Sequence, residues 1–413
     1  MVSAYVVVML VSVTAQDVSQ SALSPSNLSF SLQSGIGQQG ADVATLLRAR
    51  LQAAVGSTRV TMAAPVWLAA DGEFLTDFEE PNYYLGLLEG LSMQSEEGEV
   101  SLVAGALSQQ TLGHGVLVDS YQSKHDPLRY RTGARFDLRS RAVDITVLAD
   151  DLLRPHVVAG AVGIAPLTLA GMDPDRRLRI ALEAAADIYA PRFDTEASLG
   201  ALDLDIAFAI WRSADLMVEL FVAGAYISKP AWGAHSGILL QWMGETQSAL
   251  RFRLEATASA DGYVPGYFDD AYSFERFALP ERNWMPKAEQ NPRGAVGVRA
   301  RFDAQAGWAR FGFAASLADP RRPGSLSLYT RLQRSTWSAA VILSHRSLSE
   351  GADLLDIAGP ATTASIEGAY CFAGGFFAFT QLRHGMRRSQ GALGHVNDWM
   401  IGVGYGAQSE PTQ

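Results

Sequence analysis

The chain has 413 residues, of which 48% are hydrophobic and 18% are charged, and its formal net charge is -10. This length and apolar content allow one large folded domain, and the negative charge gives a nucleic-acid partner no electrostatic footprint. The single cysteine, Cys371, excludes a disulfide framework and argues against a cysteine-ligated zinc or iron-sulfur site.

The first 15 residues have the length and apolar character of an export signal. Small residues at Val13 and Ala15 resemble a cleavage site, although no Lys or Arg precedes the apolar run, and a buried strand is the alternative. Beyond this point no stretch reaches the roughly 18 to 20 apolar residues that a membrane helix needs. An exported chain can still cross a membrane as a closed β-barrel, because closure satisfies every backbone polar group. We predict a signal peptide over residues 1–15 and a single domain over residues 16–413.

Residues 109–130 are rich in glycine and in ionisable side chains, and they interrupt the strand pattern. In a barrel, such a segment either folds into the lumen as a constriction or forms a long external loop. The sequence favours neither alternative. The candidates for lining a constriction are His114, Asp119, Lys124, His125 and Asp126.

Residues 177–188 and 202–210 alternate apolar and polar side chains with a period of two, which is typical of β-strands. Charged side chains such as Glu183, Asp203 and Asp205 recur at every second position within these runs. A charged face needs water, so the pattern fits strands that separate lipid from a watery lumen.

The same alternation is clearest over residues 249–259, where Leu254 and its apolar neighbours share one face and Arg253 and Glu255 share the other.

Residues 262–276 then form a second irregular segment with spaced aromatic side chains. This segment is either a ligand-binding loop or, as the favoured alternative, a packed cap with an exposed acidic turn.

The two irregular segments carry the patterns Gly-His-Gly, at residues 113–115, and Gly-Tyr-x-Pro-x-Tyr-Phe-Asp, at residues 262–269. In these patterns and in its strand rhythm, the chain resembles uncharacterised, porin-like outer-membrane barrels of spirochaetes and related bacteria. The resemblance implies the fold and the location. It brings no catalytic residues.

Residues 295–317, 325–343 and 365–379 read as successive hairpins with tight turns, and residues 398–406 read as a last strand. The polar faces of these strands are predicted to line a pore. Together with residues 249–259 they supply Arg251, Arg253, Glu255, Arg299, Arg301, Asp303, Arg310, Arg331 and Glu367.

These elements predict an all-β, transmembrane antiparallel β-barrel with short periplasmic turns and longer external or in-folded loops. If each strand and its connection take about 22 to 25 residues, the barrel has about 16 strands, within a range of 14 to 18. The alternative is a soluble all-β protein. Its strands would also alternate, but their polar faces would lie outside and their apolar faces inside.

The predicted function is a passive, porin-like channel for small hydrophilic solutes in the outer membrane, in contact with outer-membrane lipid. A non-conducting structural or adhesion barrel is the alternative. A lipid hydrolase is disfavoured, because no Gly-x-Ser-x-Gly pattern appears and Ser344-His345 is the nearest hint of a nucleophile and base. We therefore expect no enzymatic activity. The oligomeric state is left open.

No metal-binding pattern and no cofactor are expected, because acidic pairs such as Asp150-Asp151 and Asp269-Asp270 are isolated along the chain and are usually solvated. Calcium on an external loop is an alternative that no pattern supports.

Charge is unevenly distributed along the chain. The segment after residue 240 contains 17 Lys and Arg against 16 Asp and Glu, so the acidic excess lies before it. If the arginine rows face the lumen, a modest preference for anions is expected. The alternative is that Glu255, Asp303 and Glu367 neutralise these arginines along neighbouring strands, which would remove the preference.

Overall fold

The computed structural model describes residues 27–39, 42–74, 81–95, 97–123, 131–173, 175–191, 196–228, 231–244, 248–270, 272, 276, 287–288, 291–318, 324–334, 336–348, 362–372, 375–389 and 392–408. The predicted signal peptide and the candidates Lys124, His125 and Asp126 therefore lie outside the described residues.

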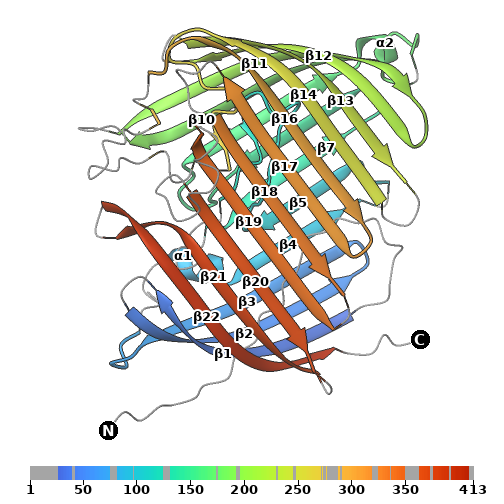
Figure 1. Cartoon of the computed structure of the whole chain (residues 1–413). Coiled ribbons are helices and arrows are strands. Elements are labelled where there is room, and N and C mark those ends of the chain that lie inside the picture. Colours follow the sequence, from blue (N-terminus) through green and yellow to red (C-terminus); the bar gives the residue numbers. More distant parts are fainter. Residues whose placement is uncertain are drawn as a thin grey trace.

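Twenty strands form one closed antiparallel barrel, in which the first strand pairs with the last (Figure 1). The first ten are β1 (Asn27–Gln39), β2 (Asp42–Val55), β3 (Thr58–Ala69), β4 (Leu88–Gln94), β5 (Val100–Gly105), β7 (Gly133–Arg139), β8 (Val143–Ala149), β9 (Val157–Ile164), β10 (Leu178–Pro191) and β11 (Glu196–Arg212). The other ten are β12 (Leu216–Ile227), β13 (Ala231–Met243), β14 (Ser248–Ser259), β16 (Ala295–Ala306), β17 (Ala309–Ala318), β18 (Gly324–Gln333), β19 (Trp337–Leu348), β20 (Thr362–Cys371), β21 (Phe376–Ser389) and β22 (Ala392–Gln408). The predicted fold class is confirmed.

The predicted strand number was too low, because the barrel has 20 strands rather than about 16. Two causes explain the difference. Several connections are very short, as between β2, which ends at Val55, and β3, which begins at Thr58. Eight barrel strands also precede residue 177, where glycine, alanine and serine at many positions weaken the alternation that marks a strand.

The apolar rows of the strands face outward and the polar rows face the lumen. In β11, Leu202 and Leu204 are about half exposed, whereas Asp203 and Asp205 between them are 1% exposed. Outward rows around the barrel expose large apolar side chains in the same way, including Val222, Leu254, Val298, Ile366 and Ile401. This exterior suits lipid, so the barrel is of the outer-membrane type and the soluble alternative does not fit.

Two short helices, α1 (Pro81–Gly86) and α2 (Pro166–Leu169), lie in connections between strands. No helix in the described part of the chain is long and apolar enough to cross a membrane.

The two longest described connections, between β5 and β7 and between β14 and β16, leave the barrel wall at the same end and fold inward. Each contributes one very short strand, β6 (Val118–Asp119) and β15 (Phe268–Asp269), and these two strands pair in parallel. We call the described residues of 106–123 and 260–288 the plug. The structure thus places residues 109–123 in the lumen, so the in-folded segment is the one of the two alternatives that describes them.

The plug has an apolar core of its own, in which Tyr263, Tyr267 and Phe268 are fully buried. It packs against alanines that face inward, namely Ala159, Ala185, Ala201, Ala223, Ala225 and Ala231. These small side chains leave room for the plug on one side of the lumen. At Gly233 of β13, a Cβ atom would lie 2.2 Å from the Tyr263 ring, so only glycine permits this approach.

Candidate functional site

The plug contacts two charged regions of the barrel wall, one acidic and one basic, which lie side by side in the sheet. The acidic wall consists of Glu183 on β10, Asp203 and Asp205 on β11, and Glu219 on β12. The basic wall consists of Arg251 and Arg253 on β14 and of Arg299 and Arg301 on β16. Only β13 separates the two walls in the sheet. The uneven charge along the sequence therefore becomes an uneven charge around the lumen.

His114 of the plug contacts the acidic wall. Its Nδ1 lies in hydrogen-bond contact with Asp205, its Nε2 is 2.8 Å from a carboxylate oxygen of Glu219, and its ring stacks on Phe221 with centroids 4.1 Å apart. Two carboxylate partners require both ring nitrogens to donate, which only the imidazolium form does. Burial lowers the pKa of His114, but the hydrogen bonds to Asp205 and Glu219 outweigh burial and raise the pKa above its ordinary value.

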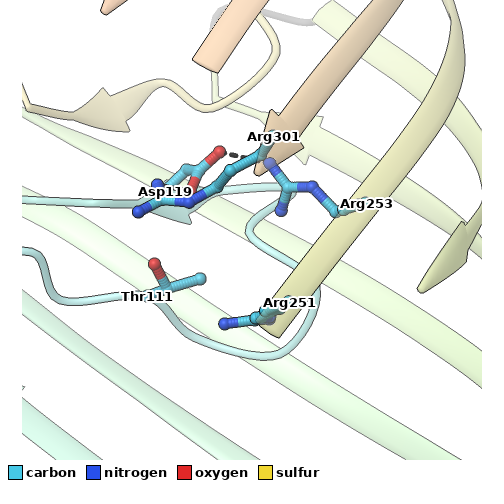
Figure 2. Close-up of a pocket in the computed structure, with 5 residues that line it drawn as sticks. All are labelled: Thr111, Asp119, Arg251, Arg253 and Arg301. Atoms are coloured by element: carbon cyan, nitrogen blue, oxygen red, sulfur yellow. Dashed lines mark hydrogen bonds and ion pairs between the residues drawn. The ribbon is translucent and has the colours of Figure 1, made fainter. Parts of the chain in front are cut away.

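Asp119 of the plug contacts the basic wall. Its carboxylate pairs with Arg253, lies 2.8 Å from Nη2 of Arg299, and lies 3.2 Å from Nη1 of Arg301. Figure 2 shows Asp119 directed toward Arg253 and Arg301. Burial alone would raise the pKa of Asp119, but the three arginines outweigh burial and hold the pKa well below its ordinary value. Asp119 is therefore ionised and neutralises much of the wall.

Carboxylates on the strands neutralise part of the same wall. Glu255 lies 2.5 Å from Nδ1 of His235 and 3.4 Å from Nη1 of Arg299. Asp303 accepts a hydrogen bond of 2.8 Å from Nε of Arg301 and one of 3.2 Å from the Tyr329 hydroxyl. Glu255 and Asp303 thus each pair with an arginine of the basic wall, whereas Glu367 pairs with Arg383.

Arg251 differs from the other arginines of the basic wall. It lines a pocket with Thr111, Asp119, Arg253 and Arg301 (Figure 2). Among the described residues, no hydrogen bond or ion pair joins the Arg251 guanidinium to a carboxylate.

The remaining predicted pore residues lie farther around the barrel. Arg310 faces Arg331 in register across β17 and β18, and its guanidinium lies 5.7 Å from the centroid of the Tyr329 ring. Glu367 on β20 is hydrogen-bonded to Gln381 and is 3.3 Å from Nη2 of Arg383. The structure does not bring these residues to Asp119.

Several contacts of the plug were not predicted from the sequence. Asp150, expected to be solvated, is fully buried and accepts hydrogen bonds from the Tyr121 hydroxyl at 3.2 Å and from Arg131 at 3.0 Å. Asp187 likewise accepts a hydrogen bond of 2.7 Å from the Tyr272 hydroxyl. The period-two acidic residues were a signal that carboxylates face inward. The sequence did not indicate which residues in distant loops would pair with these carboxylates.

Ser344 and His345 do not form a nucleophile and base pair. The Ser344 hydroxyl is 3.1 Å from the Ser327 hydroxyl, and Nδ1 of His345 is 2.7 Å from the Thr362 hydroxyl. As consecutive residues of β19, their side chains lie on opposite faces of the sheet. The hint of hydrolase chemistry at these residues is therefore wrong.

No family model matches the chain, and no curated protein matches it. Among solved structures, the chain is similar to Pseudomonas aeruginosa OccK5 (OpdH), with 12% identity, coverage of 94% of this chain and 99% of that chain, and a TM-score of 0.37. It is also similar to P. aeruginosa OprD, with 12% identity, coverage of 95% and 98%, and a TM-score of 0.37. For the P. aeruginosa outer membrane protein OpdK, the identity is 11%, the coverage is 93% and 99%, and the TM-score is 0.34.

Proposed function

We propose that this protein is an outer-membrane channel for the passive passage of small hydrophilic solutes, with its lumen narrowed by the plug. The observation that carries the proposal is the sorting of side chains in 20 closed strands, which places apolar rows outside and charged rows inside. A barrel of this size encloses a lumen wide enough for water unless it is filled.

The proposal includes the predicted organisation of the chain. Residues 1–15 would serve as the export signal, and residues 16–413 would form the barrel, in contact with outer-membrane lipid. We also propose that the chain is related to the porin-like barrels of spirochaetes. The patterns Gly-His-Gly and Gly-Tyr-x-Pro-x-Tyr-Phe-Asp in the two irregular segments support this relationship.

The solute path is proposed to run between the plug and the wall formed by β17 to β21. The plug's apolar core packs against β9 to β13, and Asp119 binds the basic wall on β14 and β16. On β17 to β21, lumenal side chains remain partly exposed, including Arg310, Tyr329, Arg331, Glu367 and Arg383. Polar side chains in contact with water suit a hydrophilic solute.

A modest preference for anions follows from the basic wall. Its four arginines, Arg251, Arg253, Arg299 and Arg301, face three carboxylates, those of Asp119, Glu255 and Asp303. One positive charge is thus left over, and Arg251 is the arginine without a carboxylate partner. A small anionic solute would be attracted to this point of the lumen.

A non-conducting structural or adhesion barrel is the second candidate. The fully buried aromatic core of the plug favours it, because a core packed in this way fills the lumen rather than lining a path.

Solute uptake by proteoliposomes distinguishes the two candidates. The purified barrel is reconstituted, and swelling is followed with neutral sugars of increasing size and with small carboxylate and ammonium ions of equal size. We expect uptake that falls with solute size and is faster for the carboxylate. A matched protein with residues 109–123 replaced by a Gly-Ser linker should take up larger solutes. The absence of swelling with both proteins would favour the structural barrel.

A further inference from the structure

Three carboxylates of the acidic wall converge on one point beneath the plug. Glu183 on β10 faces Asp203 on β11 directly in the register of the two strands, and Asp205 follows two residues along the same face. One carboxylate oxygen from each of these three residues lies within 4.8 Å of the others. Like charges placed directly opposite each other in a sheet are destabilising, so this arrangement needs a counter-charge.

The counter-charge is incomplete among the described residues. Each of the three side chains is 1% exposed. Both carboxylate oxygens of Glu183, both of Asp203, and Oδ1 of Asp205 are buried without a hydrogen-bond partner. Only Oδ2 of Asp205 has one, the ring of His114. Five buried carboxylate oxygens therefore lie close together without a hydrogen-bond donor among the described residues, an arrangement that is costly unless a cation binds them.

The plug encloses this volume from the lumenal side. Gly113, with a φ of +46°, lies so close that a Cβ atom there would be 1.7 Å from Oε1 of Glu183 and 3.3 Å from Oδ2 of Asp205. On the wall side, the neighbouring lumenal positions are the small residues Ala181, Ala223 and Ala225. The carboxylates are thus held in a closed compartment between the barrel wall and the Gly-His-Gly turn.

We propose that Glu183, Asp203 and Asp205 bind one hard divalent cation of the calcium type. The ligand atoms are all carboxylate oxygens, which calcium prefers, whereas zinc prefers nitrogen and sulfur. Calcium takes six to eight oxygens and accepts bidentate carboxylates, while magnesium retains several waters in a strict octahedron. Two bidentate carboxylates, together with Oδ1 of Asp205, supply five ligands. Oδ2 of Asp205 keeps its hydrogen bond to His114, so the ion and the imidazolium share one carboxylate.

The proposed ion would fasten the plug to the wall, because it neutralises the surface on which the Gly-His-Gly turn lies. This site does not depend on conduction. A barrel that never opens would still bind the ion, and a channel without the ion would still conduct, so the two proposals fail separately.

Refolding of the full chain tests the proposal. Urea-denatured protein is folded into detergent with EDTA, or with calcium chloride at matched ionic strength. Bound calcium per chain is measured by elemental mass spectrometry after free ions are removed, and the unfolding temperature is recorded. We expect one calcium per chain and a higher unfolding temperature in calcium than in EDTA. Wild-type protein that folds without bound calcium and unfolds at the same temperature in both buffers would overturn the proposal, since the carboxylates would then carry protons.

Three variants locate the ion. Asp203→Asn and Glu183→Gln should each weaken calcium binding by at least about tenfold. The control is Asp137→Asn, at a buried lumenal carboxylate that already pairs with Arg135 at 2.8 Å, and it should bind calcium like the wild type. Undiminished binding by Asp203→Asn and Glu183→Gln, with both proteins shown to be folded by heat-modifiable migration, would place the ion elsewhere and overturn the assignment.

Discussion

Arg253 and Arg301 face each other directly across β14 and β16, and the carboxylate of Asp119 contacts both guanidinium groups. Two like charges at such a cross-strand position repel each other, so the strands need the plug for a counter-charge. Five residues before Asp119, His114 makes the opposite kind of contact with Asp205 and Glu219. The plug is thus anchored at two points by charges of opposite sign.

The Asp119→Asn variant tests the anchor at the basic wall. Removing one partner of a buried ion pair costs about 3 to 5 kcal/mol, because the remaining charges stay buried and unpaired. The loss should appear in the plug and not in the barrel, whose strand hydrogen bonds are unchanged. We expect lower hydrogen-exchange protection over residues 109–123, with unaltered protection of β10 to β14. Asp175→Asn, at an exposed carboxylate, is the control. Equal protection in variant and control would argue against an anchoring role for Asp119.

The Gly113→Ala variant tests how closely the plug approaches the acidic wall. Gly113 and Gly56 have positive φ angles of +46° and +56°, so alanine strains the backbone at both. Only at Gly113 does the new Cβ meet another group, Oε1 of Glu183, whereas nothing lies within 4 Å at Gly56. We expect Gly113→Ala to lower the unfolding temperature more than Gly56→Ala and to expose residues 109–123 to protease. The same effect from both substitutions would mean that backbone strain alone is responsible.

Much of the barrel could be predicted from the sequence, because the side-chain period of a strand is local. Asp203 and Asp205, set between Leu202, Leu204 and Ile206, identify the lumenal face without any knowledge of neighbouring strands. The strand number was wrong because runs rich in small residues before residue 177 carry too little contrast between the two faces.

The anchors of the plug could not be predicted in the same way. His114 was a candidate, but its partner Glu219 is 105 residues away in the chain. Asp119 and Arg301 are separated by 182 residues. Such pairs are fixed by the register of strands and by the path of an in-folded connection, and neither is encoded in local periodicity. The sequence showed only that the acidic excess lies before residue 241.

The pH dependence of the plug is expected to follow His114. Its pKa in the folded protein lies above the ordinary value of about 6.5, so the stabilisation from its ion pairs is complete below that value and is lost as the pH rises through the folded-state pKa. Protection of residues 109–123 should therefore fall with rising pH, and in His114→Gln this dependence should disappear. The groups around the ring are Asp205, Glu219, Glu183, Asp203 and Arg179. An identical pH profile in wild type and His114→Gln would assign the titration to another group.

The Arg251→Ser variant tests the selectivity of the lumen. Because Arg251 has no carboxylate partner, its replacement removes a positive charge without breaking an ion pair of the plug. We expect the reversal potential in a salt gradient to shift toward cation preference, with little change in thermal stability. Arg141→Ser, in the exposed turn between β7 and β8, is the control and should leave the reversal potential unchanged. If both variants keep the wild-type anion-to-cation ratio, Arg251 does not face the ion path.

Single-channel recording in planar bilayers most directly tests whether this barrel is a channel narrowed by a charge-anchored plug. Wild type, Asp119→Asn and the protein with residues 109–123 replaced by a Gly-Ser linker are compared in the same salt. We expect small discrete openings from wild type, larger or more frequent openings from Asp119→Asn, and the largest from the linker protein. If all three folded proteins show no openings, or if all three show the same conductance, the claim that the plug narrows a channel is contradicted.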